Sequence, residues 1–118
     1  MKIKIKKYKK VKSTNDIALK LIKKNSPEPT LVTAEKQTNG RGRVGKKWIS
    51  KKGNLFISLF FKFDKRKVNF QQFALLNAFL LKKVISKIVL KNIKIKWPND
   101  LIFNKKKFCG ILQEVIKF

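Results

Sequence analysis

The chain has 118 residues and a formal net charge of +25, with 31 Lys and Arg residues against six Asp and Glu. This length suits a single domain with one modest core. With no His and only one Cys, Cys109, the composition argues against an internal disulfide, a zinc site and Ser–His or Cys–His nucleophile pairs. The basic residues divide 17 and 14 between residues 1–59 and 60–118, which favours a generally basic surface over a nucleic-acid docking patch.

The beginning of the chain, MKIKIKKYKK, is basic but lacks the apolar stretch of a signal peptide. The longest apolar runs are too short to span a bilayer. We therefore expect a cytoplasmic protein that does not bind membranes.

In the first half of the chain, the alternation of Ile3, Ile5 and Tyr8 with lysines predicts an edge strand. The STND segment, residues 13–16, supplies N-cap residues for a short helix, and the following prolines, Pro27 and Pro29, are expected to end it. The segments LVTAE and GNLFISLFFKF predict a short strand and a buried strand.

In the second half, apolar residues recur every three or four positions over residues 70–89, which predicts a long helix capped by Asn69. Its expected core face consists of Phe73, Leu76, Leu80, Val84 and Ile88. NIKIKW predicts a strand, PND a turn, and residues 101–118 a hairpin. The predicted class is α+β, with two helices on one face of a largely antiparallel sheet.

The segment TNGRGRVGKKW, residues 38–48, matches the beginnings of two phosphate-binding glycine patterns, GxGxxG and GxxxxGK. Both patterns hold phosphate at the start of a helix, whereas a β-rich segment follows here, and Lys47 stands where Ser or Thr is needed. Two of the three arginines, Arg41 and Arg43, nevertheless lie in this loop, although the chain has 28 lysines. A guanidinium pairs with carboxylate or phosphate through two hydrogen bonds, and glycines let backbone N–H groups approach a ligand. The loop therefore predicts an anion site, beside which Trp48 is either a core residue or a stacking surface.

A second group of polar residues follows in KWPNDLIF, residues 96–103. The proline favours extended backbone before it, so Asn99 and Asp100 are expected on a turn at a strand end. In the next segment, KKFCGIL, Lys107 precedes Gly110 by three residues, which is compatible with a lysine that points inward where the backbone comes close to a ligand. A plain Asx turn and a surface lysine are the alternative interpretations.

Taken together, STN, Gln37, GRGRVGKKW, KWPNDL and KFCGIL resemble the catalytic domain of biotin–protein ligases, whose family also contains lipoate ligases. The resemblance runs from Ser13 to Glu114 in the order of the family. It implies the catalytic-domain fold of that family, which is similar to class II aminoacyl-tRNA synthetases. It also implies an ATP-dependent, AMP-forming ligase that makes biotinyl-5′-AMP and transfers biotin to a lysine of a carboxylase's biotin carboxyl carrier domain.

The resemblance implies a role for each matching residue. The implied biotin-binding residues are Ser13, Thr14, Asn15, Gln37, Gly40, Arg41, Gly42, Arg43, Lys107 and Gly110. The implied ATP-binding residues are Arg41, Arg43, Trp48, Lys96, Asn99 and Asp100, with Asp100 also near Mg²⁺. Arg43 and Lys107 are expected to stabilise the charge that develops during adenylation.

The chain also departs from the family pattern. We expect one partial catalytic domain over residues 1–118, without an N-terminal DNA-binding domain or a C-terminal β-barrel domain, and therefore no specific DNA binding. Lipoate or octanoate ligation, a truncated inactive ligase and a basic nucleic-acid-binding protein are the alternative functions, and the sequence leaves a homodimer open.

Overall fold

The computed structural model describes residues 2–24, 28–64 and 66–117. The chain divides into two compact units, Met1–Phe63 and Asp64–Phe118. Among the described residues, no helix combines the length and the apolar character needed to cross a membrane. Pro27, which was expected to help end the first helix, lies outside the described residues.

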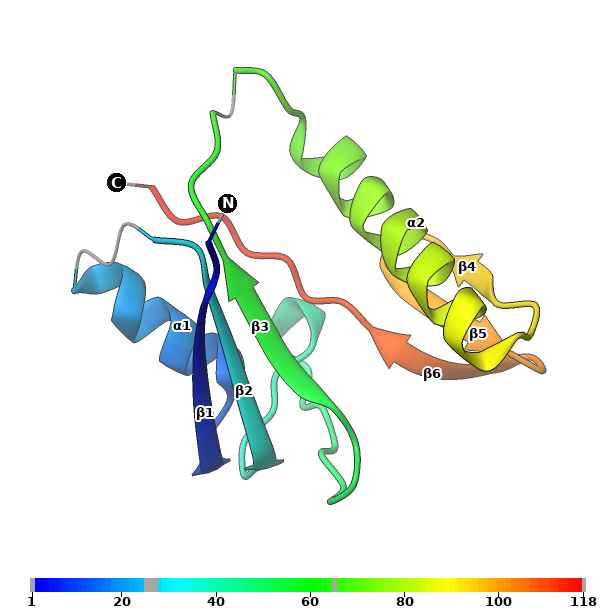
Figure 1. Ribbon diagram of the computed structural model, residues 1–118, viewed down its shortest axis with the longest axis horizontal. Helices are drawn as coiled ribbons and strands as arrows, with labels where there is room; N and C mark the ends of the chain where they lie inside the picture. The colour runs from blue at the N-terminus through cyan, green and yellow to red at the C-terminus, as the bar shows by residue number, and fades with distance from the viewer. Residues whose placement is uncertain (1, 25–27, 65, 118) are drawn as a thin grey trace. The chain divides into compact units, whose positions relative to one another are not determined.

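The first unit contains a three-stranded sheet with one helix packed on it (Figure 1). Its elements are β1 (Lys4–Val11), α1 (Thr14–Lys23), β2 (Thr30–Gln37), the 3-10 turn η1 (Arg43–Gly45) and β3 (Phe56–Phe60). The strand order is β1-β2-β3, with β1 and β2 parallel and β2 and β3 antiparallel. The lysine-rich β1 is thus an edge strand, as its alternation predicted. Because β1 and β2 are parallel, α1 serves as the crossover between them.

The core of the first unit is formed by apolar side chains of the strands and α1. The buried apolar residues of this unit are Val11, Ala18, Val32, Ala34 and Phe56. The prediction of a wholly buried third strand is wrong, because Ile57 and Leu59 are 46% and 48% exposed. Only the alternate side chains of Phe56 and Ser58 are buried, as a strand covered on one face requires.

The second unit pairs a long helix with a second three-stranded sheet. It contains α2 (Phe70–Val89), β4 (Lys94–Lys96), β5 (Asp100–Phe103) and β6 (Lys106–Gly110), and the antiparallel strands follow one another in the order β4-β5-β6. The helix has the predicted bounds, and the Asn69 side chain caps it by accepting a 2.8 Å hydrogen bond from Gln71 N. Asn104 and Lys105 both have positive φ, which suits the two-residue turn between β5 and β6. The predicted α+β class is confirmed, with the strands in two sheets rather than one.

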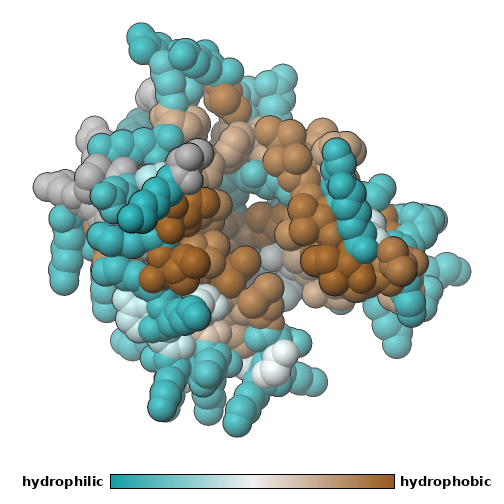
Figure 2. All heavy atoms as spheres, in the orientation of Figure 1, coloured by the Kyte–Doolittle hydropathy of each residue, from teal (hydrophilic) through white to brown (hydrophobic). Residues whose placement is uncertain are grey.

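The predicted core face of α2 is wrong at four of its five residues, and the fifth, Phe73, is only partly buried. Leu76, Leu80, Val84 and Ile88 are between 46% and 75% exposed, whereas Ala78 is fully buried. The helix is apolar on almost every side, so a three-to-four-residue spacing exists on more than one face and does not select the buried one. Figure 2 shows the resulting exposed apolar side chains, bordered by long hydrophilic ones.

The hairpin expected over residues 101–118 is shorter than predicted, because β6 ends at Gly110. Beyond it, Ile111 N donates to Asn99 O at 2.9 Å, and Asn99 Nδ2 donates to Ile111 O at 2.6 Å. The side chain of Gln113 accepts from Asn77 Nδ2 at 2.8 Å and donates to Phe70 O at 3.0 Å. Ile111 is therefore tied to the turn before β5 and Gln113 to α2, and residues 111–117 do not extend the strand. Residue 118 lies outside the described residues.

Candidate functional site

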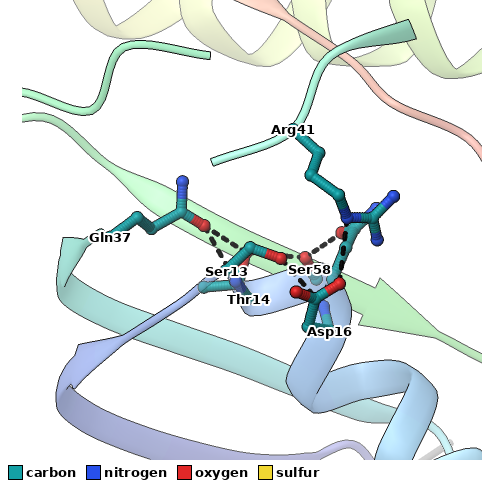
Figure 3. A network of polar contacts seen from close by, with 7 residues as sticks. Ser13, Thr14, Asp16, Gln37, Arg41 and Ser58 are labelled. Carbon is teal, nitrogen blue, oxygen red and sulfur yellow. Dashed lines mark hydrogen bonds and ion pairs between the residues drawn. The ribbon is translucent and has the colours of Figure 1, made fainter. Parts of the chain in front are cut away.

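The predicted polar residues of the first unit meet where α1 begins and β2 ends. The parallel register pairs Val11 with Gln37, so the chain leaving β1 enters α1 beside the last residue of β2. Ser13 is the N-cap of α1, and its Oγ accepts a 3.0 Å hydrogen bond from Asp16 N. Ser13 and Thr14 are both buried. Ser13 therefore acts as the predicted helix cap, while Thr14 is hydrogen-bonded to Gln37 at the end of β2 (Figure 3).

Gln37 is the centre of this polar cluster. Its Oε1 accepts from Thr14 N at 2.8 Å and from Thr14 Oγ1 at 3.2 Å. Its Nε2 donates to Ser50 Oγ at 3.0 Å, and Ser50 Oγ in turn donates to Trp48 O at 3.2 Å. One amide side chain thus connects the start of α1 to the segment that follows the glycine loop.

Ser58 of β3 completes the cluster, although the sequence analysis did not single it out. Its Oγ lies 2.8 Å from Thr14 Oγ1 and is hydrogen-bonded to Asn15 Oδ1. Ser58 is only 8% exposed. Ser58 could have been found from the sequence as a hydroxyl at an inward position of an apolar strand, because a buried polar group needs a hydrogen-bond partner.

The glycine loop is a tight turn closed by backbone hydrogen bonds. Gly42 N donates to Lys46 O at 2.6 Å, and Trp48 N donates to Gly40 O at 2.8 Å. Val44 and Gly45 have positive φ at its tip. The loop returns on itself and opens no α-helix, which agrees with the rejection of the dinucleotide and phosphate-loop interpretations.

Gly40 is required by close packing rather than by its backbone angle. A Cβ atom at this position would lie 2.6 Å from Ser50 Oγ and 2.7 Å from Trp48 O. At Gly42 the nearest atom to such a Cβ, Lys46 O, would be 3.4 Å away. The first glycine of the loop therefore allows the backbone to pass beside the Gln37–Ser50 hydrogen bond.

The two arginines of the loop have different surroundings. Arg41 Nε donates to Asp16 Oδ1 at 2.9 Å, which ties the loop to the first turn of α1 (Figure 3). Both side chains are about one third exposed, at 31% and 32%. Arg43 lies in η1 and is exposed. The sequence analysis included Asp16 only among the N-cap residues and did not predict its ion pair, because its partner lies 25 residues away.

A pocket of about 280 Å³ lies beside this cluster. It is lined by residues 37–40 at the end of β2 and by residues 47–50 on the returning segment. Trp48 is partly buried and lines the pocket. Of its two interpretations, a core residue or a stacking surface, the first is therefore wrong. The lining combines an amide, hydroxyls, an ammonium group and an indole ring, which suits a polar heterocyclic ligand.

The remaining predicted site residues belong to the second unit. Lys107 Nζ lies 3.2 Å from Asp100 Oδ1, and the two side chains are 41% and 12% exposed. Gly110 is paired with Asp100 across the β5–β6 ladder. Asn99 is held by its hydrogen bond to Ile111 O, while Lys96 at the end of β4 is exposed. The structure thus gathers these residues around the first residue of β5.

Cys109 lies within this second group. Burial raises the pKa of the Cys109 thiol, the negative charge of Asp100 raises it further, and the positive charge of Lys107 partly opposes both effects. The thiol is therefore held in its neutral form, and it is a poor nucleophile.

Comparisons with known proteins agree with the motifs. The model of the Biotin/lipoate A/B protein ligase family matches residues 8–117. The chain belongs to this family.

A curated relative, the bifunctional ligase/repressor BirA of Bacillus spizizenii, is 41% identical over 106 residues, which are 89% of this chain and 33% of the relative. The chain therefore spans about a third of the length of this family member. Among solved structures, a biotin acetyl coenzyme A carboxylase synthetase from Helicobacter pylori, with bound biotinylated ATP, is similar with a TM-score of 0.86. It is 30% identical, and the match covers 98% of this chain and 56% of that one. The biotin protein ligase of Aquifex aeolicus in complex with biotin and ATP is similar with a TM-score of 0.82 and 33% identity, over 97% of this chain and 47% of that one.

Proposed function

We propose that this family member binds biotin and ATP and takes part in biotin–protein ligation. The observation that carries the proposal is the polar cluster of Thr14, Gln37 and Ser58 beside the glycine loop and its pocket. A ureido ring needs short, well-oriented donors and acceptors, and this cluster offers hydroxyl and amide groups held by one another. The similarity to ligases solved with biotin and ATP supports the same assignment.

The first step of the proposed reaction is adenylation. A carboxylate oxygen of biotin attacks the α-phosphorus of ATP, the bond from that phosphorus to the bridging oxygen breaks, and pyrophosphate leaves. Little covalent work falls to side chains, so positioning and charge stabilisation dominate. Arg43 has the exposure needed to meet an anion, whereas Arg41, tied to Asp16, positions the loop. The loop, with its backbone N–H groups and glycines, shields the mixed anhydride from water.

The residues of the second unit are assigned to ATP. Lys107 neutralises charge that grows on the α-phosphate, and Asn99, Asp100 and Lys96 contact the ribose, the phosphates or Mg²⁺. The described residues contain no group of three or more His, Cys, Asp or Glu side chains that could hold a metal ion. Asp100 offers one carboxylate, which fits a Mg²⁺ ion that arrives with ATP and takes most of its ligands from phosphate and water.

In the second step, the ε-amine of a lysine on a carrier domain attacks the carbonyl carbon of biotinyl-5′-AMP. The bond from that carbon to the phosphate oxygen breaks, AMP leaves, and the amine loses a proton. We propose the biotin carboxyl carrier domain of a carboxylase as the acceptor, and a cytoplasmic location stays a prediction.

The proposal is tested by biotin-dependent exchange of labelled pyrophosphate into ATP, catalysed by the 118-residue chain. Exchange that requires biotin supports it, and exchange driven by lipoate or octanoate instead would assign the chain to the other branch of the family. Calorimetric binding of biotin is measured alongside. A chain that binds no biotin, but binds single-stranded nucleic acid tightly and with a steep salt dependence, would replace the proposal by nucleic-acid binding.

A further inference from the structure

The Gln37 amide is held at both ends. Its oxygen accepts two hydrogen bonds from Thr14, one from the backbone N–H and one from the hydroxyl. The backbone N–H can only donate, so it identifies the atom facing it as the amide oxygen and fixes the orientation of the whole group. The amide nitrogen then faces Ser50 Oγ at 3.0 Å.

The donor and acceptor roles of the Ser50 hydroxyl can be assigned in only one way. A serine hydroxyl has one proton, and at Ser50 it is donated to Trp48 O. The same oxygen must therefore act as acceptor toward Gln37 Nε2. Gly40 leaves the space that this contact needs, since a Cβ there would lie 2.6 Å from Ser50 Oγ.

From this geometry we infer that Ser50 is a positioning residue for ligand recognition by Gln37. The Ser50 hydroxyl oxygen accepts a hydrogen bond from one N–H of the Gln37 amide. This contact holds the second N–H as a fixed donor beside the pocket that both residues line. The amide oxygen is turned toward the backbone N–H of Thr14, so the ligand atom that meets the remaining N–H of Gln37 is a hydrogen-bond acceptor. The inference rests on the proposed function for the identity of that ligand, biotin.

Binding of biotin to the 118-residue chain tests the inference in five variants. Ser50→Ala removes the acceptor and should weaken binding roughly 3- to 10-fold, the usual effect of losing one hydrogen bond. Ser50→Thr keeps the hydroxyl and should restore binding to within about 2-fold of the original chain. Gln37→Glu keeps the oxygen toward Thr14 but removes the donor, so it should lose as much affinity as Gln37→Ala. Ser86→Ala, in α2 of the second unit, is the matched serine control and should change nothing.

The decisive comparison is the double variant. If Ser50 acts through Gln37, Ser50→Ala should have no further effect in a chain that already carries Gln37→Ala. A merely structural serine would weaken binding equally in both backgrounds. Equal losses, an unchanged affinity of Ser50→Ala, or full affinity of Gln37→Glu would each overturn the inference.

A measurement without ligand separates this inference from the proposed function. In nitrogen–proton NMR spectra, Ser50→Ala should move the Gln37 side-chain amide signals toward those of the exposed Gln71 and Gln72. If the original chain binds no biotin, the proposed function fails. Unmoved Gln37 signals in Ser50→Ala would overturn the role of Ser50, whatever the chain binds.

Discussion

Lys107 and Asp100 form an ion pair of 3.2 Å because β6 contains a bulge. Leu101 is paired with Cys109, but the next residue of β5, Ile102, is paired with Lys107 and not with Phe108. The extra residue on β6 is therefore Phe108. In a regular ladder Phe108 would oppose Ile102, and Lys107 would lie on the opposite face of the sheet from Asp100. The bulge thus places the lysine on the face that carries the carboxylate.

This placement predicts that Lys107 differs from the neighbouring lysines, Lys105 in the turn and Lys106 at the start of β6. Lys107→Ala should lower the rate of adenylation at least ~10²-fold, since donors to developing charge typically contribute that much. The rate is measured by pyrophosphate exchange, with circular dichroism to confirm the fold. Lys105→Ala and Lys106→Ala, which remove the same charge beside it, are the controls. Equal losses in all three variants would leave Lys107 as an ordinary surface charge.

The glycine loop predicts a difference between arginine and lysine at one position. Arg43→Lys keeps the charge but loses the planar, two-pronged donor, so it should cost roughly 1–3 kcal/mol in adenylate formation. Both Arg43 and Lys46 are exposed in the same turn, which makes Lys46→Arg the matched reverse change, and it should have little effect. The activation free energy follows from kcat/KM for biotin in the exchange assay. Full activity of Arg43→Lys would argue against an anion clamp.

The Arg41–Asp16 pair predicts a modest contribution to stability. The side chains are about one third exposed, so Asp16→Asn should lower the free energy of unfolding by about 0.5–1 kcal/mol at low salt. Urea unfolding at low and high salt measures this, and the difference should shrink as salt screens the pair. A cycle with Arg41→Gln separates the pair from the favourable position of Asp16 in the first turn of α1. If the two changes prove additive, the ion pair contributes nothing.

Local patterns in the sequence were sufficient for much of the fold. The bounds of α2 and its Asn69 cap were predicted because capping and helical spacing are encoded within a few residues. The parallel pairing of β1 with β2 was not predicted, because it depends on partners that are distant in sequence. Dependence on partners that are distant in sequence also explains which residues of the candidate site were missed. Ser13 stood out in the STN segment and Gln37 through the family resemblance, whereas Ser50 and Ser58 are isolated serines whose contacts only the folded chain reveals.

The raised pKa of the Cys109 thiol predicts a pH dependence. Alkylation by iodoacetamide should reach half of its maximal rate at a higher pH than in an unstructured cysteine peptide. Asp100→Asn should lower that midpoint, because it removes a negative charge, and Lys107→Ala should raise it. A pKa that is raised on folding stabilises the native state below the ordinary thiol pKa, and this stabilisation disappears as the pH rises through the raised value. Cys109→Ser should abolish that part of the pH dependence, and a midpoint equal to that of the peptide would contradict the prediction.

Gly40 and Gly42 lie two residues apart in the same loop but should respond differently to the same substitution. In Gly40→Ala, the new methyl group would meet Ser50 Oγ at 2.6 Å and the backbone oxygen of Trp48 at 2.7 Å. A carbonyl cannot rotate away like the end of a long side chain, so the segment around Trp48 must shift, at about 1–3 kcal/mol of unfolding free energy. The shift should also separate Ser50 from Gln37 and weaken biotin binding. In Gly42→Ala the nearest atom is 3.4 Å away, so the free energy of unfolding should stay within about 0.5 kcal/mol of the original chain. Urea unfolding of both variants and biotin titration of Gly40→Ala make the test, and equal losses of stability in the two variants would show that the close approach at Gly40 is not what the loop requires.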